Sequence, residues 1–351
     1  MLNIGIIGAG SISDKHLTAY AANTECRVKA IADLNIETAK KKAEEYKIED
    51  VYSDYHDILN DKEIDAVSIV TPTFTHKNLV IEALNAGKHV LCEKPPALNA
   101  AETRELKAAA EKSNKCLMFG FIARFGAEAK YVKEYIDVGK MGKILYAEAA
   151  RVSRASARGG WFVSKEKAGG GILLDGNIHE IDELLYVMGY PKPKAVLALT
   201  SDMNSDLPQR LGTKGWTSAD KNVYKADVEV FASALVTFEN GACLSIKAST
   251  VLNTVDVGVY MSISGEKAGM KMERFVPGKE LRMLEITDDN QMVESTPELN
   301  VANKWPLEIG HFVDCCQGKA ECITKIDEAI RLMEIIDAIY KSAETGLPVI
   351  F

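Results

Sequence analysis

Short apolar runs alternate with helical periodicity through the first 120 residues, and this order constrains the fold more than any other feature. The run Ala66–Val70 is apolar almost throughout, as a strand buried on both faces must be. A repeated strand-then-helix order requires right-handed crossovers and a parallel sheet covered on both sides. We therefore predict a doubly wound α/β domain over 1–122. Its strands are expected at 2–7, 27–32, 66–70, 88–92 and 115–120, and its helices at 12–22, 36–46, 75–86 and 99–112.

The pattern changes after residue 122. Residues 240–241 are an Asn-Gly pair between two long alternating runs, which is a strong hairpin signal. Residues 201–226 are polar and without periodicity, which indicates a long surface loop. We predict that 123–351 forms an α+β domain with a largely antiparallel open sheet, its last helix able to pack back on the first domain. Its strands are expected at 144–152, 227–238, 242–250 and 255–264, and its helices at 127–137, 173–188, 303–317 and 326–343.

Charge and composition exclude several classes of partner. A net charge of -8 offers no basic face to nucleic acid or to an anionic membrane. No apolar run reaches the roughly 20 residues of a membrane span, and residues 1–8 lead into a strand and turn, not into a signal peptide. The seven cysteines show no C-x-x-C spacing and are interpreted as small buried apolar residues. We expect a cytoplasmic protein whose partner is a small molecule.

A glycine-rich turn follows the first expected strand and opens the first expected helix. Gly8 and Gly10 allow a tight turn and let backbone amides approach a pyrophosphate at the helix N-terminus. Ser11 and Ile12 continue the turn, and Ser13 stands where a dinucleotide fingerprint has its third glycine or alanine. The turn therefore predicts a dinucleotide-binding site.

Asp33 ends the second expected strand and lies 20 residues after Ser13 (33 − 13). An acidic side chain at this distance can accept hydrogen bonds from the adenosine ribose hydroxyls, although it can also cap the next helix. The following residues are Leu34 and Asn35, so the 2′-phosphate of NADP would meet a carboxylate and no adjacent arginine. The sequence predicts NAD(H) over NADP(H).

Two further strand ends should border the same crevice, because ligands bind outside the carboxyl ends of parallel strands. One is followed by a Thr-Pro-Thr segment in which Thr75 could cap the next helix, and capping explains the threonines as well as cofactor contact does. The other is followed by Glu-Lys-Pro, which a surface ion pair and a strand stop would also explain. The cofactor candidates at these ends are Thr71, Pro72, Thr73, His76, Glu93 and Lys94.

Five segments in order resemble the glucose–fructose oxidoreductase, inositol dehydrogenase and rhizopine-catabolism (Gfo/Idh/MocA) oxidoreductases. Besides the glycine-rich turn they are 71–76, 86–95, 120–125 and 169–182. The resemblance implies an NAD-dependent dehydrogenase acting on a secondary alcohol of a cyclic polyol, sugar or sugar derivative. It also implies a homodimer or homotetramer formed through the C-terminal sheet. In similar enzymes a lysine and an Asp-x-x-x-His pair lie between nicotinamide and substrate, and here they correspond to Lys94, Asp175 and His179.

The chemistry of these three side chains fits that role. Oxidation of an alcohol needs a positioned base for the hydroxyl proton, and His179 suits this task because imidazole as a group titrates near neutrality. Asp175 lies four residues earlier on the expected helix and can orient the ring, while Lys94 can stabilise developing alkoxide charge. Whether Lys94 or His179 takes the proton stays open. A surface contact, a helix cap or a buried core histidine would also explain the Asp/His pair.

Three further residues are candidates for substrate contact. Arg124 follows the strand at 115–120 and serves an inter-domain salt bridge equally well. Trp161 can stack on a sugar face or pack in the core. Asn177 stands two residues after Asp175, where similar proteins commonly carry glycine, and could reshape the pocket floor. No second carboxylate or histidine lies at ligand spacing around His179, so no metal is predicted.

Two alternative functions stay open. Some similar proteins hydrolyse glycosides with bound NAD through a transient oxidation. A non-catalytic NAD(P)-binding regulatory protein is the second alternative, and it would keep the fold without turnover. Accumulation of NADH with substrate distinguishes a net dehydrogenase from both. His16, on the first expected helix, is interpreted as structural or as a neighbour of the pyrophosphate.

Overall fold

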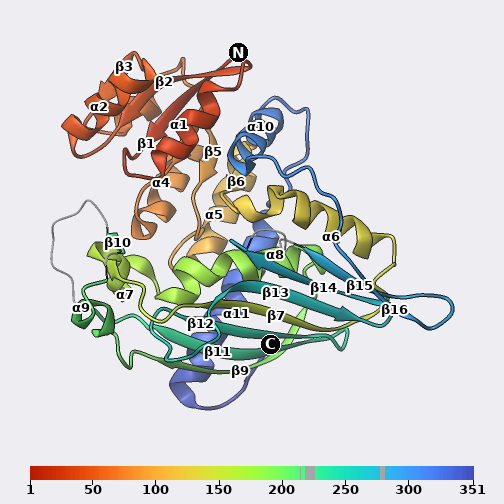
Figure 1. Cartoon of the computed structure of the whole chain (residues 1–351). Helices are drawn as coiled ribbons and strands as arrows, with labels where there is room; N and C mark the ends of the chain where they lie inside the picture. The colour runs from red at the N-terminus through yellow and green to blue at the C-terminus, as the bar shows by residue number, and fades with distance from the viewer. Residues whose placement is uncertain (214, 218–225, 277–280) are drawn as a thin grey trace. The chain divides into compact units, whose positions relative to one another are not determined.

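The computed structural model describes residues 1–213, 215–217, 226–276 and 281–351, and it divides the chain into two compact units. Unit 1 contains Met1–Ile122 and Asn303–Ile330, and unit 2 contains Ala123–Ala302 and Arg331–Phe351. Residues 303–330 therefore belong to unit 1, although they lie beyond the expected domain boundary. In Figure 1 the parallel sheet of unit 1 is coloured red to orange, and the large sheet of unit 2 olive to blue.

Unit 1 is built on a six-stranded parallel sheet with the strand order β3-β2-β1-β4-β5-β6. This is the order of a dinucleotide-binding doubly wound sheet, which reverses direction between β1 and β4. The predicted Rossmann domain is confirmed, while the short edge elements β3 and α3 were missed. The elements are β1 Leu2–Ile7, α1 Ser13–Ala21, β2 Cys26–Ala32, α2 Ile36–Tyr46, β3 Asp50–Tyr52, α3 His56–Asn60, β4 Ala66–Ile69, α4 Thr73–Asn85, β5 His89–Cys92, α5 Ala100–Ser113, β6 Leu117–Phe119 and α10 Lys304–Cys316.

Asparagine side chains fix the first turn of three helices in unit 1. Asn35 accepts from Thr38 N at the start of α2, and Asn99 and Asn303 make the same kind of contact at the starts of α5 and α10. An asparagine at this position satisfies an amide that has no partner within the helix. Lys47 and Asn114 end α2 and α5 in the left-handed conformation. These local signals make the helix bounds readable from sequence.

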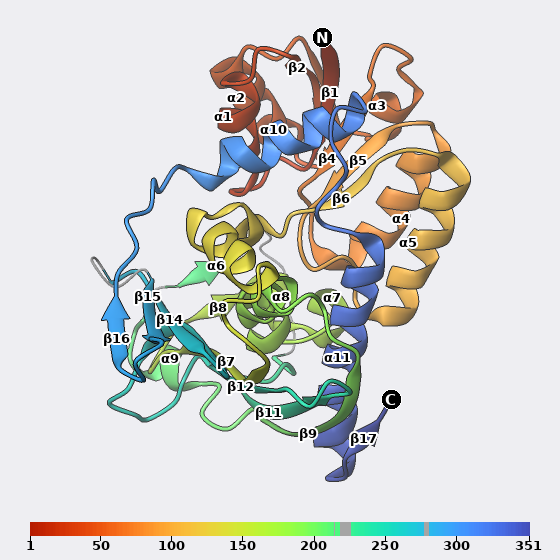
Figure 2. The same cartoon turned by 90° about the vertical axis from the view of Figure 1, so that its right-hand side faces the viewer.

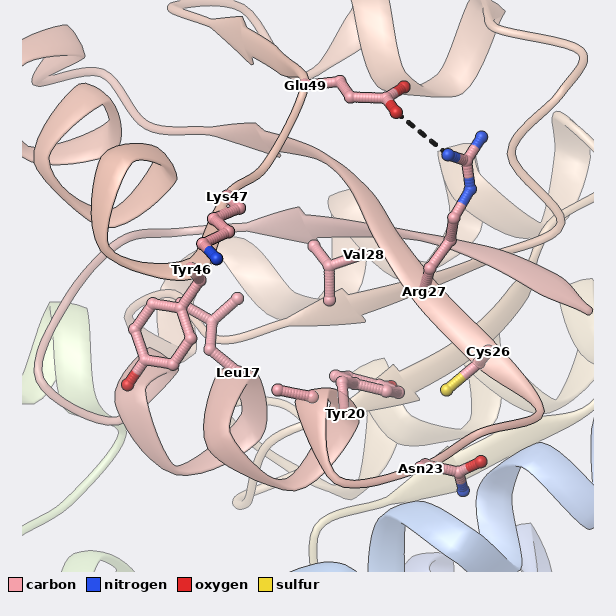
Figure 3. Close-up of a pocket in the computed structure, with 10 residues that line it drawn as sticks. Leu17, Tyr20, Asn23, Cys26, Arg27, Val28, Tyr46, Lys47 and Glu49 are labelled. Carbon is pink, nitrogen blue, oxygen red and sulfur yellow. Dashed lines mark hydrogen bonds and ion pairs between the residues drawn. The ribbon is translucent and has the colours of Figure 1, made fainter.

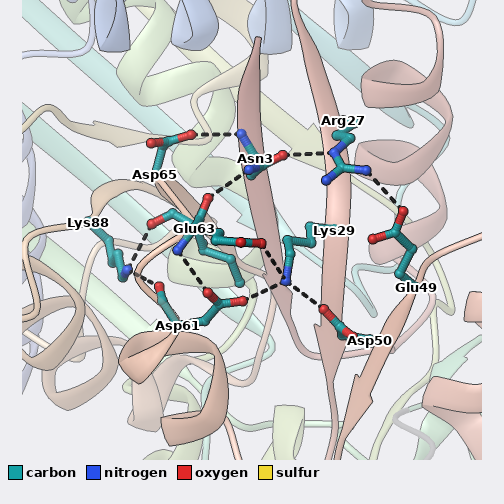
Figure 4. A network of polar contacts seen from close by, with 10 residues as sticks. Asn3, Arg27, Lys29, Glu49, Asp50, Asp61, Glu63, Asp65 and Lys88 are labelled. Atoms are coloured by element: carbon teal, nitrogen blue, oxygen red, sulfur yellow. Dashed lines mark hydrogen bonds and ion pairs between the residues drawn. The ribbon is translucent and has the colours of Figure 1, made fainter.

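The amino ends of the parallel strands carry a polar network (Figure 4). Lys29 Nζ donates to Asp50 at 2.7 Å and to Asp61 at 2.8 Å. Lys88 Nζ donates to the backbone carbonyls of Asp61 and Ile64 at 2.5 and 2.8 Å. These contacts occupy the edge opposite to the one that binds ligands in such folds. The glycine turn, Asp33, the Thr-Pro-Thr segment and Glu-Lys-Pro all follow carboxyl ends instead.

Unit 2 is built on a nine-stranded sheet with the order β16-β15-β14-β13-β7-β12-β11-β9-β17 (Figure 2). Its described neighbouring strands pair antiparallel, except for β7 with β12. The predicted open antiparallel sheet is confirmed, and the Asn240-Gly241 hairpin joins β11 to β12. Its strands are β7 Ile144–Val152, β9 Pro193–Ser201, β11 Phe231–Phe238, β12 Cys243–Ser249, β13 Gly258–Gly265, β14 Ala268–Arg274, β15 Arg282–Ile286, β16 Met292–Ser295 and β17 Val349–Ile350.

Helices and short elements complete unit 2. They are η1 Ile122–Phe125, α6 Ala127–Asp137, β8 Arg158–Gly159, η2 Gly160–Val163, α7 Lys165–Ala168, η3 Leu173–Asn177, α8 Ile178–Val187, α9 Leu207–Arg210, β10 Trp216–Thr217 and α11 Ile326–Thr345, of which η1 and α11 begin in unit 1. The expected loop 201–226 contains α9 and β10, so that prediction is wrong for these residues, whereas 214 and 218–225 lie outside the described residues. Among the helices of the described residues, none is long and apolar enough to cross a membrane.

Candidate active site

The glycine-rich turn between β1 and α1 requires its first glycine. Gly8 has a φ of +104°, and a Cβ there would lie 2.7 Å from the carbonyl oxygen of Val70. At Gly10 a Cβ would meet nothing within 4 Å, so the backbone is open on that side. The hydroxyl of Ser13 donates to the Gly10 carbonyl at 2.6 Å. The turn thus leaves room for a phosphate to approach backbone amides at the start of α1.

Asp33 is held against this turn. One carboxylate oxygen accepts from Ala9 N at 2.7 Å and the other from Asn35 N at 2.8 Å. The cap of α2 is the Asn35 side chain, which accepts from Thr38 N. The carboxylate of Asp33 is therefore placed beside the glycine turn, which suits a contact with the adenosine ribose.

The segment after β4 is ordered by side-chain bonds. Helix α4 begins at Thr73, so Thr75 lies inside the first turn and the expectation that it caps the helix is wrong. Its hydroxyl donates to the Pro72 carbonyl and also contacts the Thr71 hydroxyl, both at 2.7 Å. Proline has a fixed φ and starts a helix well, which explains the earlier start.

His76 joins this segment to the Glu-Lys-Pro segment. Its ring nitrogens lie 2.8 Å from the Pro95 carbonyl oxygen and 2.9 Å from that of Thr71. The side chain is buried at 1% exposure, and this burial lowers the pKa of His76 below its usual value. A neutral ring carries one N–H, which donates to one of the two carbonyls. The contacts make His76 a support that ties two loops together.

A buried chain of hydrogen bonds holds Glu93. His16 Nε2 lies 3.0 Å from Glu93 Oε1, and its Nδ1 lies 3.4 Å from Ser68 Oγ, which in turn contacts Tyr20 at 2.7 Å. Burial raises the pKa of Glu93, but the hydrogen bond and charge of His16, together with Lys94, bring it below its ordinary value. Glu93 is therefore a buried carboxylate paired with His16. This pairing supports the structural interpretation of His16.

Lys94 is fixed on both sides by these contacts. Its backbone N–H donates to Glu93 Oε2 at 3.1 Å, and the Lys94–Pro95 peptide is cis. Glu93 is held by His16, and the carbonyl of Pro95 by His76. The Lys94 side chain itself is partly exposed. The loop thus presents an amine at the carboxyl end of β5 from a well-supported backbone.

Asp175 lies on a π-helical segment, η3, where the sequence predicted a regular α-helix. Such segments are uncommon and occur frequently at functional sites. The carboxylate of Asp175 accepts from Arg158 Nε at 2.8 Å, and both side chains are about a quarter exposed or less. Arg158 also donates to the Ala157 carbonyl at 3.3 Å. The pairing of Arg158 with Asp175 was not predicted, because no local pattern links residues 17 positions apart.

The polar side chains in and just before helix α8 differ in their exposure to solvent. Glu180 receives two hydrogen bonds from Arg151 at 2.7 and 2.9 Å, and Glu183 is paired with Arg274. Both glutamates are buried. His179, which directly precedes Glu180 in sequence, is partly exposed, as is Asp175. The buried acids are used in structural ion pairs, which leaves Asp175 and His179 as the accessible polar groups of the Asp-x-x-x-His motif.

The glycines before η3 are explained by packing. A Cβ at Gly170 would clash with the Tyr340 hydroxyl, and one at Gly171 with the Glu229 backbone. The Glu229 carboxylate accepts from the amides of Gly171 and Leu173 at 2.7 and 3.0 Å, and Tyr340 donates to it at 3.1 Å. Burial raises the pKa of Glu229. The backbone passes close to these two residues, which explains the need for small residues at Gly170 and Gly171.

The three candidates for substrate contact occupy different surroundings in unit 2. Arg124 is 2% exposed and donates to Asp182 through Nε and Nη2 at 2.9 and 2.6 Å. Asn177 is fully buried and donates to Glu180 at 3.3 Å. Trp161 is partly exposed and stacks on Phe162 with ring centroids 3.9 Å apart. Substrate contact stays a prediction for all three, and the buried pair with Asp182 already uses the Arg124 guanidinium.

A hollow lined by residues of α1, β2 and the end of α2 contains none of the candidate residues (Figure 3). It is lined by side chains such as Leu17, Tyr20 and Val28. Its polar rim includes the Arg27–Glu49 ion pair at 3.0 Å, with both side chains exposed. Exposed pairs of this kind contribute little energy, and we assign the hollow no role in catalysis.

Comparisons with known proteins identify the family of the chain. The NAD-binding Rossmann fold of the oxidoreductase family matches residues 2–121, and the C-terminal alpha/beta domain of that family matches 133–351. The D-glucoside 3-dehydrogenase of Escherichia coli (strain K12) is 31% identical over 98% of this chain and 96% of its own length. The scyllo-inositol 2-dehydrogenase (NAD(+)) of Bacillus subtilis (strain 168) is 27% identical over 89% of this chain and 84% of its own.

A levoglucosan dehydrogenase solved in complex with NADH has the same fold, with a TM-score of 0.84 at 25% identity over 99% of this chain and 98% of that one. The expectation of an enzyme acting on CH–OH groups through an NAD(P)-binding domain is thereby confirmed. The predicted homo-oligomer stays a prediction. The chain belongs to the Gfo/Idh/MocA oxidoreductase family, and its unit 1 carries the NAD-binding Rossmann domain of that family.

Proposed function

We propose that the enzyme oxidises the C3 hydroxyl of a D-glucoside to a ketone and passes the hydride to NAD. The support is the extent of one similarity, because the D-glucoside 3-dehydrogenase is 31% identical over 98% of the chain. The inositol 2-dehydrogenase similarity is lower, at 27% over 89%. A glucoside and an inositol both present secondary hydroxyls on a six-membered ring. The enzyme class is therefore the same for either, and the proposal concerns the substrate.

Lys94, Asp175 and His179 are the proposed catalytic residues. All three side chains are partly exposed, whereas the neighbouring Glu93 and Glu180 are buried in paired contacts. When bound, the nicotinamide ring supplies the hydride acceptor. His179 takes the hydroxyl proton, Asp175 orients the imidazole, and Lys94 stabilises negative charge on the reacting oxygen. The hydroxyl loses its proton and the carbon its hydride, which leaves the 3-keto sugar.

The proposed cofactor is NAD. Asp33 is held at the end of β2 by the amides of Ala9 and Asn35. A fixed carboxylate at this position would accept ribose hydroxyl bonds and repel a 2′-phosphate. The neighbouring Leu34 is 96% exposed and offers no charge to a phosphate. We expect kcat/KM for NAD to exceed that for NADP.

A substrate panel followed by NADH absorbance tests the proposal. Methyl D-glucosides should be oxidised with the highest kcat/KM, and scyllo- and myo-inositol more slowly. Methyl 3-deoxy-D-glucoside is the matched control, because it lacks the proposed hydroxyl and should give no NADH. Equal rates with the 3-deoxy sugar would overturn the assignment to C3. Release of the aglycone without net NADH would instead support the NAD-dependent glycosidase.

A further inference from the structure

Three cysteines that are distant in sequence meet in unit 1. Cys116 directly precedes β6, Cys315 lies in the last turn of α10, and Cys322 lies in the loop after that helix. Their Sγ atoms all lie within 4.8 Å of one another. His311 is one helical turn before Cys315, and its Nε2 lies 3.4 Å from the Cys315 Sγ. Three sulfurs and one imidazole nitrogen therefore gather at one place.

We propose that Cys116, Cys315 and Cys322, with His311 as the fourth ligand, form a structural Zn²⁺ site. Three thiolates and one imidazole are a common ligand set of closed tetrahedral zinc sites. A Zn–S bond of about 2.3 Å gives neighbouring sulfurs of a tetrahedron a separation of about 3.8 Å. The observed spacing exceeds this separation by about 1 Å or less. Small side-chain movements are therefore enough to close the site around the ion.

A disulfide is the competing use of these cysteines. It would join two sulfurs at about 2.05 Å and leave the third sulfur and the imidazole without a role. All three cysteines are free thiols in the structure. A metal ion uses every member of the cluster, since each thiol that loses its proton becomes a ligand and the ring coordinates in its neutral form. The composition of the cluster therefore favours Zn²⁺.

His311 needs one rearrangement to bind the ion. Its Nε2 accepts a hydrogen bond from the backbone N–H of Ile323 at 3.1 Å. On coordination the lone pair of this nitrogen binds zinc, and the Ile323 N–H would donate to a neighbouring thiolate. Such donors to ligand atoms are a usual part of the surroundings of a metal site.

The site would fasten residues 303–330 to the parallel sheet. Cys315 and Cys322 belong to that segment, whereas Cys116 directly precedes strand β6 of the sheet. In the same strand, the Phe119 N–H donates to Thr324 Oγ1 at 3.1 Å. The same segment carries Trp305, whose ring lies 5.5 Å from that of His16. The binding energy of a structural metal adds to folding stability. The ion would therefore also stabilise the segment that contacts His16, the partner of Glu93.

Metal analysis of the full chain tests the proposal. The protein is purified under reducing conditions and incubated with Zn²⁺. Unbound metal is then removed, and the zinc content of the protein is measured by mass spectrometry. We expect one zinc per chain in the wild type and in the control Cys243→Ser, which changes a thiol outside the cluster. Cys116→Ser and Cys322→Ser should lose most of the zinc. Circular dichroism and NAD binding show whether these variants are folded.

Spectroscopy identifies the ligands without relying on the variants. Co²⁺ in place of Zn²⁺ should give thiolate-to-metal charge-transfer absorption and the strong visible bands of tetrahedral coordination. His311→Ala should keep the charge-transfer band and shift the visible bands. Absence of zinc from the reconstituted wild type, or octahedral Co²⁺ spectra, would overturn the proposal. Five free thiols in the unfolded, unreduced chain would also overturn it, since a disulfide removes two of the seven cysteines.

Discussion

The two candidate catalytic segments are supported by different chemistry. The segment around Lys94 depends on histidines, with His16 bonded to Glu93 and His76 to the Pro95 carbonyl. The segment around Asp175 and His179 depends instead on guanidinium groups, each paired with a carboxylate: Arg124, Arg151, Arg158 and Arg274. A guanidinium stays charged at any pH that a folded protein meets, whereas an imidazole changes charge near neutrality. We therefore expect histidine replacement and changes of pH to disturb the segment in unit 1. Loss of an arginine should instead disturb the segment in unit 2.

The largest effect is expected where each segment contributes a proposed catalytic side chain. Lys94→Ala and His179→Ala should each lower kcat by about 10²- to 10⁴-fold, because each removes a proposed acid–base or electrostatic group. NAD affinity, measured by fluorescence titration, should survive. Lys112→Ala and His56→Ala are matched controls at exposed positions and should keep wild-type turnover. A variant with an unchanged rate would remove that residue from the mechanism.

Removal of the buried Arg124 should lower the stability of unit 2. Arg124→Ala leaves the buried Asp182 carboxylate without its guanidinium and should lower the free energy of unfolding by about 3–5 kcal/mol. Arg210→Ala breaks an exposed pair with Asp206 and should change it by about 0.5 kcal/mol or less. Urea unfolding measures both. Equal, small losses of unfolding free energy in the two variants would mean that the buried pair does not stabilise this segment.

Replacement of His16 should affect turnover more than cofactor binding. His16→Ala removes the partner of Glu93, so the Lys94 backbone loses one of its two supports. Since displacement of about 1 Å can cost about 10²-fold in rate, we expect kcat to fall by about ten- to a hundredfold with little change in the Kd for NAD. His16→Gln, whose amide can donate to Glu93, should recover part of the rate. Loss of NAD binding with unchanged kcat would place His16 at the cofactor.

Acid should weaken the support of unit 1 through Glu93. The pKa of Glu93 is lowered in the folded chain, so its ionised form contributes stability above the ordinary carboxyl value of about 4.3. That contribution is lost as the pH falls through the lowered value. Glu93→Gln should therefore show a flatter loss of stability in acid than the wild type, as measured by urea unfolding at a series of pH values. The exposed Glu45→Gln is the control and should follow the wild type.

Sequence patterns predicted those features that depend on neighbouring residues. The strand and helix order of unit 1, the turn at Gly8 and the placement of Asp33 follow from short periodicities and fixed spacings. Three-residue strands such as β3 carry too little alternation to be recognised. The exposed strand β16 likewise shows no buried face in its sequence. Local sequence patterns therefore predicted the fold class and some of the boundaries of the helices and strands.

Contacts between distant residues could not be predicted in this way. His16 and Glu93 are 77 residues apart, and Cys116 and Cys322 are separated by 206 (322 − 116). The run Gly169–Gly171 is a similar case, because Gly170 and Gly171 are required by the Tyr340 hydroxyl and the Glu229 backbone, which are distant in sequence. Such causes become visible only once the sheet and helices are packed.

Transfer of an isotopic label tests the central claim most directly. Methyl β-D-glucoside carrying deuterium at C3 is incubated with the enzyme and NAD, and the NADH is analysed by mass spectrometry and proton NMR. The proposed function predicts NADH with one deuterium at nicotinamide C4, formed at a rate that falls sharply in Lys94→Ala and His179→Ala. NADH without deuterium, or no NADH from any glucoside or inositol, would contradict it.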